Sequence, residues 1–254
     1  MLTPTFVSIA PNNSGNSAKT VLTISNVVVT GNLLMVFVGY NGGSPTVSTL
    51  KWNTTENLTL LDVRSSGSSP PVGGEIWYLK NPTKTTADVV ITMTGEIWSI
   101  LGWAVDIDKA DVTGTTFSDV AAHAGSSVNR AVDVTVTTVV DQLVIDVMSK
   151  RYTDVTDGVL VQNAGQTLRD LEKNSISEGT NISYGGISTK VATTTSTNMG
   201  WSWTTNNRSC TLQAVGINGL QGLPNIKSIN GIAAASIKTV NGISVASIKS
   251  IQGL

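Results

Sequence analysis

The chain has 254 residues, of which 40% are hydrophobic and 13% are charged, and its formal net charge is −1. This length suffices for one large domain or two small ones with a packed core. Thr and Ser together supply 61 residues, whereas Glu occurs five times. A chain poor in Glu and rich in Thr, Val, Ile and Gly lacks helix formers and has strand formers in excess. Long helical architectures are therefore excluded.

Charge, cysteine content and hydropathy exclude further classes of protein and of binding site. The small net charge argues against attraction of the whole molecule to nucleic acid or to an anionic membrane. The single cysteine, Cys210, excludes a disulfide framework within the chain and any cysteine-cluster metal site. The first residues lack the basic and apolar regions of a signal peptide. No apolar stretch approaches the roughly 18 residues of a membrane span, so we expect neither secretion nor membrane insertion.

Strand-like segments recur about every ten residues and are bounded by Gly, Asn, Asp or Pro. In Val132–Val140, apolar and polar residues alternate, as expected for a strand with one face in water. Leu33–Val38 is apolar throughout and is expected in the middle of a sandwich. In chain order the predicted strands are Val21–Asn26, Asn32–Tyr40, Asn57–Arg64, Glu75–Leu79, Asp88–Thr94, Ile97–Ile107, Val132–Val140, Gln142–Met148, Gly158–Gln162, Asn181–Val191, Gly200–Thr204 and Cys210–Ile217. The sequence therefore predicts an all-β fold.

An internal repeat links the two halves of this body. A shift of 110 residues superposes three strand regions: Leu33–Val38 on Leu143–Met148, Leu22–Ile24 on Val132–Val134, and Ala104–Ile107 on Ala214–Ile217. Two arrangements follow, namely tandem small sandwiches or one larger jelly roll in which each half supplies a Greek key. We expect the single jelly-roll-like β-sandwich over residues 1–220, with halves of about 1–110 and 111–220, because no Pro-, Gly- and Ser-rich linker separates them.

Residues 221–254 form a tail with an eleven-residue repeat. Its unit, Ile-Lys-Ser-Ile-Asn-Gly-Ile, begins at Ile226 and recurs in related form from Ile237 and Ile248. This period can indicate a supercoiled helix, but Gly at one phase of every repeat costs about 1 kcal/mol in a helix. Asn-Gly between β-branched residues favours a two-residue hairpin turn, since both residues tolerate positive φ. We predict turns at Asn230-Gly231 and Asn241-Gly242, with Ile229 paired to Ile232 and Val240 paired to Ile243.

The tail is also expected to bind a partner. It carries three Lys and no acidic residue, a charge of +3, while the remainder has 13 basic and 17 acidic residues and a charge of −4. Isolated hairpins are marginal in water, so an ordered tail needs other copies of itself or another protein. The alternative is a solvated, mildly basic tail. Strand edges would add to a neighbouring sheet, and the predicted docking residues are Ile226, Lys227, Ile229, Ile232, Ile237, Lys238, Val240, Ile243, Ile248, Lys249 and Ile251.

Candidate catalytic and metal-binding residues each have a simpler structural interpretation. His123 is the one histidine, and no Gly-x-Ser-x-Gly motif accompanies it, so a surface position is favoured over the base of a Ser-His-Asp triad. Asp106, Asp108 and Asp111 cluster, but the segment lacks the Gly and Glu of an EF-hand loop and includes Lys109. One of these carboxylates is expected to cap the turn instead. We expect no enzymatic activity, no metal and no cofactor.

Aromatic residues leave one binding alternative open. Trp201 and Trp203 share one face of a predicted strand and could form a platform on which a sugar ring stacks. In the other interpretation they fill the core between two sheets. With three Phe and four Tyr elsewhere, the core needs these rings, so the core interpretation is favoured.

Over roughly residues 5–220, the strand pattern resembles jelly-roll modules of tailed-bacteriophage virion proteins and of bacterial surface proteins. The segments that carry the resemblance are Thr30–Gly39, Glu75–Leu79, Val139–Val147 and Ala214–Ile217. The tail repeats resemble carboxy-terminal repeats of phage structural proteins, and this is the sharper match. The resemblance implies a non-enzymatic virion component, such as a capsid decoration, head-fibre or tail-associated protein. It would be made in the host cytoplasm and would contact other virion proteins and copies of itself. A receptor- or glycan-binding module is the alternative.

Overall fold

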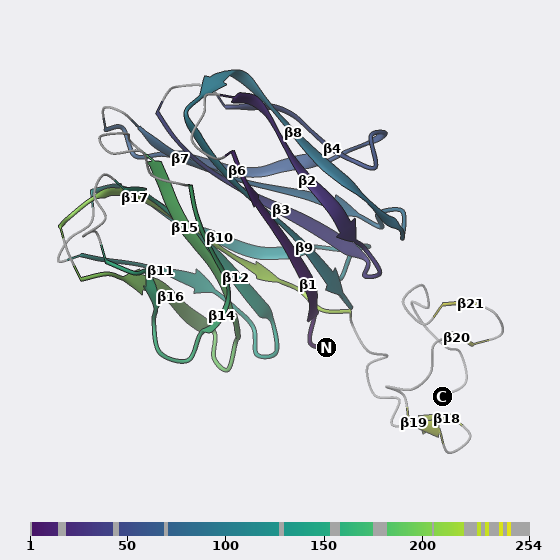
Figure 1. Cartoon of the computed structure of the whole chain (residues 1–254). Coiled ribbons are helices and arrows are strands. Elements are labelled where there is room, and N and C mark those ends of the chain that lie inside the picture. Colours follow the sequence, from purple (N-terminus) through teal and green to yellow (C-terminus); the bar gives the residue numbers. More distant parts are fainter. Residues whose placement is uncertain are drawn as a thin grey trace.

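The computed structural model describes residues 2–14, 19–42, 46–68, 71–126, 130–152, 158–174, 182–204 and 206–220, together with four two-residue strands in the tail. These residues form antiparallel β-sheets and contain no helix, so the all-β prediction is confirmed. The body consists of stacked sheets (Figure 1).

The first half of the body builds two sheets. Its inner sheet has five strands in the order β1 (Thr5–Asn13), β9 (Ser99–Asp108), β3 (Leu33–Asn41), β7 (Val72–Lys80) and β6 (Thr59–Ser65). Its outer sheet has the order β2 (Lys19–Val28), β8 (Thr86–Ile97), β4 (Val47–Trp52) and β5 (Glu56–Asn57).

The second half repeats this arrangement. Its inner sheet has the order β10 (Phe117–Ser126), β17 (Ser209–Ile217), β12 (Leu143–Tyr152), β15 (Ile182–Val191) and β14 (Thr167–Lys173). Its outer sheet has the order β11 (Ala131–Thr137), β16 (Ser196–Ser202) and β13 (Val161–Gln162). Even the bulges repeat, since the register shifts between Leu60 and Asp62 in β6 and between Leu168 and Asp170 in β14.

Each half is a jelly roll in its own right. If β5 and β6 count as two parts of the fifth strand, both inner sheets run 1-8-3-6-5, and the outer sheets run 2-7-4-5 and 2-7-4. These orders interleave the two sheets as a jelly roll does. The jelly-roll-like sandwich and its internal duplication are thus confirmed. Below, the first jelly roll denotes β1–β9 and the second jelly roll denotes β10–β17.

Strand pairing corrects the expected arrangement of the halves. We expected each half to supply a Greek key to one shared sandwich. Among the described residues, however, every strand ladder lies within one half, and an isolated bridge from Ala110 to Gly219 joins their ends. The tandem arrangement is therefore the one formed, and the two jelly rolls stack into four layers.

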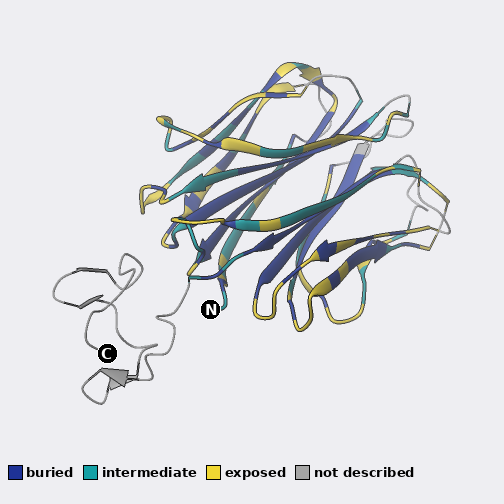
Figure 2. Cartoon of the chain, turned by 180° about the vertical axis from the view of Figure 1, so that it is seen from behind, coloured by how far each residue is buried: buried dark blue, intermediate teal, exposed yellow. Residues whose placement is uncertain are grey.

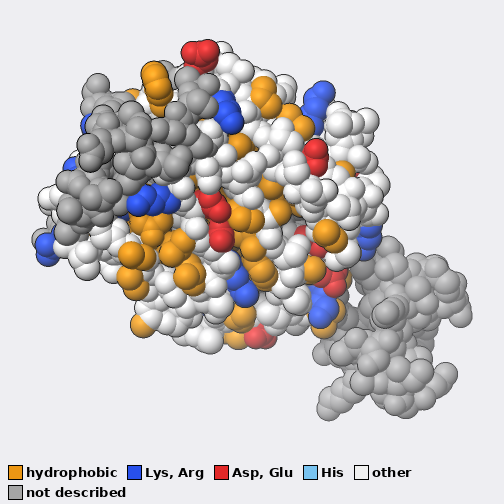
Figure 3. Space-filling model, in the orientation of Figure 1, with side chains coloured by type: hydrophobic (Ala, Val, Ile, Leu, Met, Phe, Trp, Pro, Cys, Tyr) orange, Lys and Arg blue, Asp and Glu red, His pale blue; other side chains and the backbone are white. Residues whose placement is uncertain are grey.

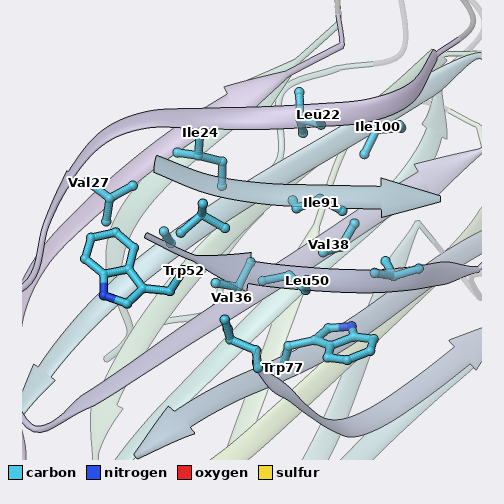
Figure 4. Close-up of a cluster of buried hydrophobic side chains, with 14 of the residues drawn as sticks. Leu22, Ile24, Val27, Val36, Val38, Leu50, Trp52, Trp77, Ile91 and Ile100 are labelled. Carbon is cyan, nitrogen blue, oxygen red and sulfur yellow. The ribbon is translucent and has the colours of Figure 1, made fainter. Parts of the chain in front are cut away.

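Apolar residues on both faces of the inner strands explain the four layers. All nine residues of β3 are buried. Leu34, Val36 and Val38 pack in the core of the first jelly roll, where Figure 4 labels Val36 and Val38. Leu33, Met35 and Phe37 face the other way, into a central core shared with the second jelly roll. A strand that is apolar throughout requires a cover on each side, and here the inner sheet of the other jelly roll provides the second cover. Figure 2 shows the buried positions concentrated along these inner strands.

The two jelly rolls meet through reciprocal contacts. Strand β1 lies against β14, and its counterpart β10 lies against β6. At the centre, a Cβ on Gly39 would lie 2.8 Å from the Ser149 hydroxyl, and these two residues occupy equivalent positions on β3 and β12. Contacts in which equivalent strands exchange roles define an isologous interface. The halves are therefore related by a pseudo-two-fold axis.

Candidate functional site

The tail forms the predicted hairpins in its described strands. β18 (Ser228–Ile229) pairs with β19 (Ile232–Ala233), and β20 (Thr239–Val240) pairs with β21 (Ile243–Ser244). The predicted pairs Ile229–Ile232 and Val240–Ile243 are confirmed. The second hairpin repeats the first after eleven residues. Outside the described residues lie the turn residues Asn230, Gly231, Asn241 and Gly242, and the docking candidates Ile226, Lys227, Ile237, Lys238, Ile248, Lys249 and Ile251.

The proposed sugar platform at Trp201 and Trp203 is corrected by the structure. Trp201 is fully buried and Trp203 is 5% exposed. Both indoles pack in the core between the two sheets of the second jelly roll, and their N–H groups donate to Asp146 and to the carbonyl of Asn206. The inner sheet covers the face that a sugar would need, so the core interpretation holds.

Asp146 is a buried carboxylate at the centre of the second core. Its Oδ1 accepts hydrogen bonds from the backbone N–H and hydroxyl of Ser188 at 3.0 and 2.6 Å. Its Oδ2 accepts from Trp201 Nε1 at 2.9 Å and from Gln166 Nε2 at 3.1 Å. Burial raises the pKa of Asp146 to about 7, although these donors oppose the rise. Because four donors surround a carboxylate with no exposure, the arrangement serves the core rather than a substrate.

The first jelly roll has an apolar residue at the position equivalent to Asp146. Strand register places Asp146 at the position of Val36 and Ser188 at the position of Trp77. Val36 and Trp77 belong to the apolar core of the first jelly roll (Figure 4). The duplication has thus kept the backbone plan while the two cores have diverged in chemistry.

The first jelly roll buries a carboxylate elsewhere. Glu75 accepts hydrogen bonds from Val47 N–H at 2.9 Å, from Trp77 Nε1 at 2.9 Å and from the Tyr40 hydroxyl at 3.3 Å. Burial raises the pKa of Glu75. The pKa of Tyr40 is also raised, first by burial and then by the charge of Glu75. A phenol held neutral in this way acts as a hydrogen-bond donor to the carboxylate.

A lysine occupies the position of Tyr40 in the second jelly roll. Lys150 is fully buried, with its Nζ 5.1 Å from the ring centre of Trp203 and 5.7 Å from that of Tyr184. Cys210 lies directly across the ladder from Lys150. Burial raises the pKa of the Cys210 thiol to about 12, and the nearby Lys150 charge opposes this. A thiol with a raised pKa is a poor nucleophile, so this cluster has the character of a structural cation–π contact.

The acidic cluster and the histidine also take structural positions. The Asp106 carboxylate accepts hydrogen bonds from Thr30 N–H at 2.8 Å and Gly31 N–H at 3.0 Å, so it holds the turn between β2 and β3. Asp111 accepts from the backbone of Thr113 and Gly114. His123 lies within β10 and is half-buried. Within the described ranges, no group of three or more His, Cys, Asp or Glu is placed to hold a metal.

Trp98 is the aromatic residue that sequence reasoning missed. It is 58% exposed and follows the last residue of β8. The sequence offered one signal, since Trp98 lies two residues after Glu96 and four after Thr94 and so is in phase with these polar residues. On the face that Figure 3 shows, acidic and basic side chains are few and interspersed.

Comparisons with known proteins add no family to this description. The chain matches no protein-family model, no curated protein and no solved structure. In its described part, no helix is long and apolar enough to cross a membrane.

Proposed function

We propose that the chain is a non-enzymatic structural component of a phage virion. In this proposal the two jelly rolls form a rigid displayed body, and the tail docks that body onto copies of itself or onto another virion protein. Capsid decoration, head-fibre and tail-associated positions all fit this description. The observation that carries the proposal is the pair of tail hairpins that repeat after eleven residues.

The hairpins support docking because they are too small to be stable alone. Each described tail strand has two residues, whereas an isolated two-stranded hairpin is at best marginally stable in water. Each described tail sheet has two strands, whose outer edges and β-branched residues suit strand addition to a partner. A tail of charge +3 on a remainder of charge −4 also favours association between copies.

The body supports an architectural role. Its buried carboxylates, among them Glu75, Asp106 and Asp146, accept hydrogen bonds from the turns and core side chains around them. The alternative of a glycan-binding module that uses Trp201 and Trp203 has lost its support, because both rings are buried.

Light scattering tests the docking role of the tail. The full chain, a chain ending at Gly222, and a full chain carrying Ile232→Asp and Ile243→Asp would be compared. We expect an oligomer for the full chain and folded monomers for the other two, because a buried charge in each hairpin opposes sheet addition. If all three are monomers, self-association is excluded and the tail must dock onto another virion protein.

Mass spectrometry of purified phage particles tests the virion assignment directly. The proposal expects the chain in the particle at a fixed ratio to the capsid protein. Its absence from particles, with the chain present in the lysate, contradicts the assignment.

A further inference from the structure

Trp98 differs from every other tryptophan of the chain. It is 58% exposed, whereas the exposed fraction is 9% or less for Trp52, Trp77, Trp103, Trp201 and Trp203. Exposing this much of the largest apolar side chain is unfavourable in a free protein. Tryptophan is enriched where proteins bind ligands and partners, because one large rigid ring supplies much contact area.

The turn that carries Trp98 is anchored by both jelly rolls. The next residue, Ser99, is fully buried, and its hydroxyl oxygen accepts hydrogen bonds from Ser183 N–H at 2.7 Å and from Asn174 Nδ2 at 2.8 Å. Both donors belong to the second half of the chain. The following residue, Ile100, donates its N–H to the Ser14 hydroxyl at 3.0 Å. The ring is therefore presented from a fixed backbone, which lowers the entropic cost of binding.

A glycine lies beside the Trp98 side chain. Gly42 has φ +107°, a conformation that side chains rarely adopt, and a Cβ there would lie 3.4 Å from the Trp98 Cδ1. The backbone conformation at this position therefore favours glycine, and Gly42 lies beside the indole.

The exposed side chains that precede Trp98 in phase with it are polar. Thr94, Glu96 and Trp98 are exposed, while Met93, Ile97 and Ser99 are buried, so the first three share the outer face. A protein interface usually has a contiguous apolar centre of larger area. An exposed aromatic ring preceded on the same face by a carboxylate and a hydroxyl instead suits a pyranose, whose C–H face would pack on the indole while its hydroxyls donate to carboxylate oxygens.

We propose that Trp98 is a stacking platform for a glycan, with the Glu96 carboxylate as a hydrogen-bond acceptor for sugar hydroxyls. The site lies on the first jelly roll and does not involve the tail. It would give the body an adhesive function beside its architectural one. The proposal therefore stands or fails separately from the docking role of the tail.

Titration calorimetry with the full chain tests this site. The probes are soluble trisaccharides of glucose, of galactose and of N-acetylglucosamine. We expect saturable binding of at least one of them, weakened on the order of tenfold or more by Trp98→Ala and less by Trp98→Phe, which keeps a ring. Glu96→Gln should weaken binding as well. Val159→Ala is the matched control, because Val159 is 62% exposed on the second jelly roll, and binding should not change.

Two results would overturn the proposal. One is the lack of saturable binding to any probe at millimolar concentration. The other is binding that Trp98→Ala leaves unchanged, with circular dichroism showing a folded variant. If the sugars fail but Trp98→Ala lowers the mass of the protein in solution, the ring belongs to a contact between copies and the glycan assignment is wrong.

Discussion

The indole N–H of Trp103, in the first jelly roll, donates a hydrogen bond of 2.8 Å to the carboxylate of Asp170, in the second. The reverse contact also exists, since Gln213 Nε2 donates to Asp62 at 2.8 Å. Trp103 and Gln213 are equivalent positions on β9 and β17, and each aspartate follows the same bulge. The duplication has therefore preserved the plan of this contact although one donor is an indole and the other an amide.

Two equivalent glycines make room for these donors. A Cβ on Gly185 would lie 2.7 Å from the Trp103 ring, and a Cβ on Gly74 would lie 2.4 Å from Gln213 Oε1. Such positions close to the axis require the smallest residue because a long side chain from the other half crosses over them. The interface between the two jelly rolls, called the seam below, is thus built from matched pairs of residues. Equivalent substitutions on its two sides can therefore be compared.

Asp170→Ala should destabilise the protein by about 1–3 kcal/mol, because the fully buried indole of Trp103 loses its acceptor. Asp62→Ala should act similarly through Gln213. The measurement is the free energy of unfolding in urea, with Asp133→Ala on the exposed face of β11 as the control. The importance of these bonds is refuted if both seam variants stay within about 0.5 kcal/mol of the unchanged chain.

Gly185→Ala should cost more stability than Gly74→Ala. A methyl group at 185 would meet the backbone oxygen of Met148 at 2.5 Å as well as the Trp103 ring, whereas at 74 it meets the movable ends of Gln213 and Thr211. Overpacking of this kind costs about 1–3 kcal/mol where the neighbours cannot yield. Urea unfolding of the two variants gives the comparison. Equal losses would mean that the central backbone relaxes as readily as a side chain.

Asp146 should make stability depend on pH. Burial raises its pKa from an ordinary 3.8 to about 7, so the folded state holds the proton more tightly than the unfolded state. Its contribution is present below about pH 4 and is lost as pH rises through about 7. The expected loss is on the order of 1–4 kcal/mol.

Asp146→Asn isolates this effect because an amide does not titrate. The decline in the free energy of unfolding between about pH 4 and pH 7 should flatten in this variant. The Asp133→Asn control should keep it. An unchanged pH profile in Asp146→Asn would show that this carboxyl is not the responsible group.

The Cys210 thiol should be inert in the native chain. It is fully buried, and burial raises its pKa to about 12. At pH 8 a disulfide reagent should modify one thiol per chain in denaturant and react with the folded chain at least about a thousandfold more slowly. Rapid labelling of the folded protein would indicate local opening of β17.

Much of the fold follows from local patterns in the chain. Alternation predicted strands such as β11, and the 110-residue shift predicted the duplication that strand register then displays. The tail pairs Ile229–Ile232 and Val240–Ile243 were predictable because an Asn-Gly turn sets the register of a hairpin by itself.

Contacts between segments that are distant in the sequence could not be predicted from such local patterns. Leu33–Val38 reveals that both of its faces are buried, but not which sheet covers them, so the four-layer stack escaped prediction. Alternation put Trp98 in phase with polar residues, but it could not decide whether another sheet covers the face that Trp201 and Trp203 share. An opposing sheet buries Trp201 and Trp203, whereas Trp98 at the end of β8 has no such cover.

The sequence alone thus determined what depends on neighbours along the chain: strand content, the repeat, and hairpin register, each set by backbone preferences over a few residues. The tertiary structure alone decided what depends on distant segments. It sets which sheets stack, which side chains cross the seam at Trp103 and Asp170, and which aromatic ring stays in water. These choices depend on the complementary shapes of surfaces far apart in the chain, and no local period records them.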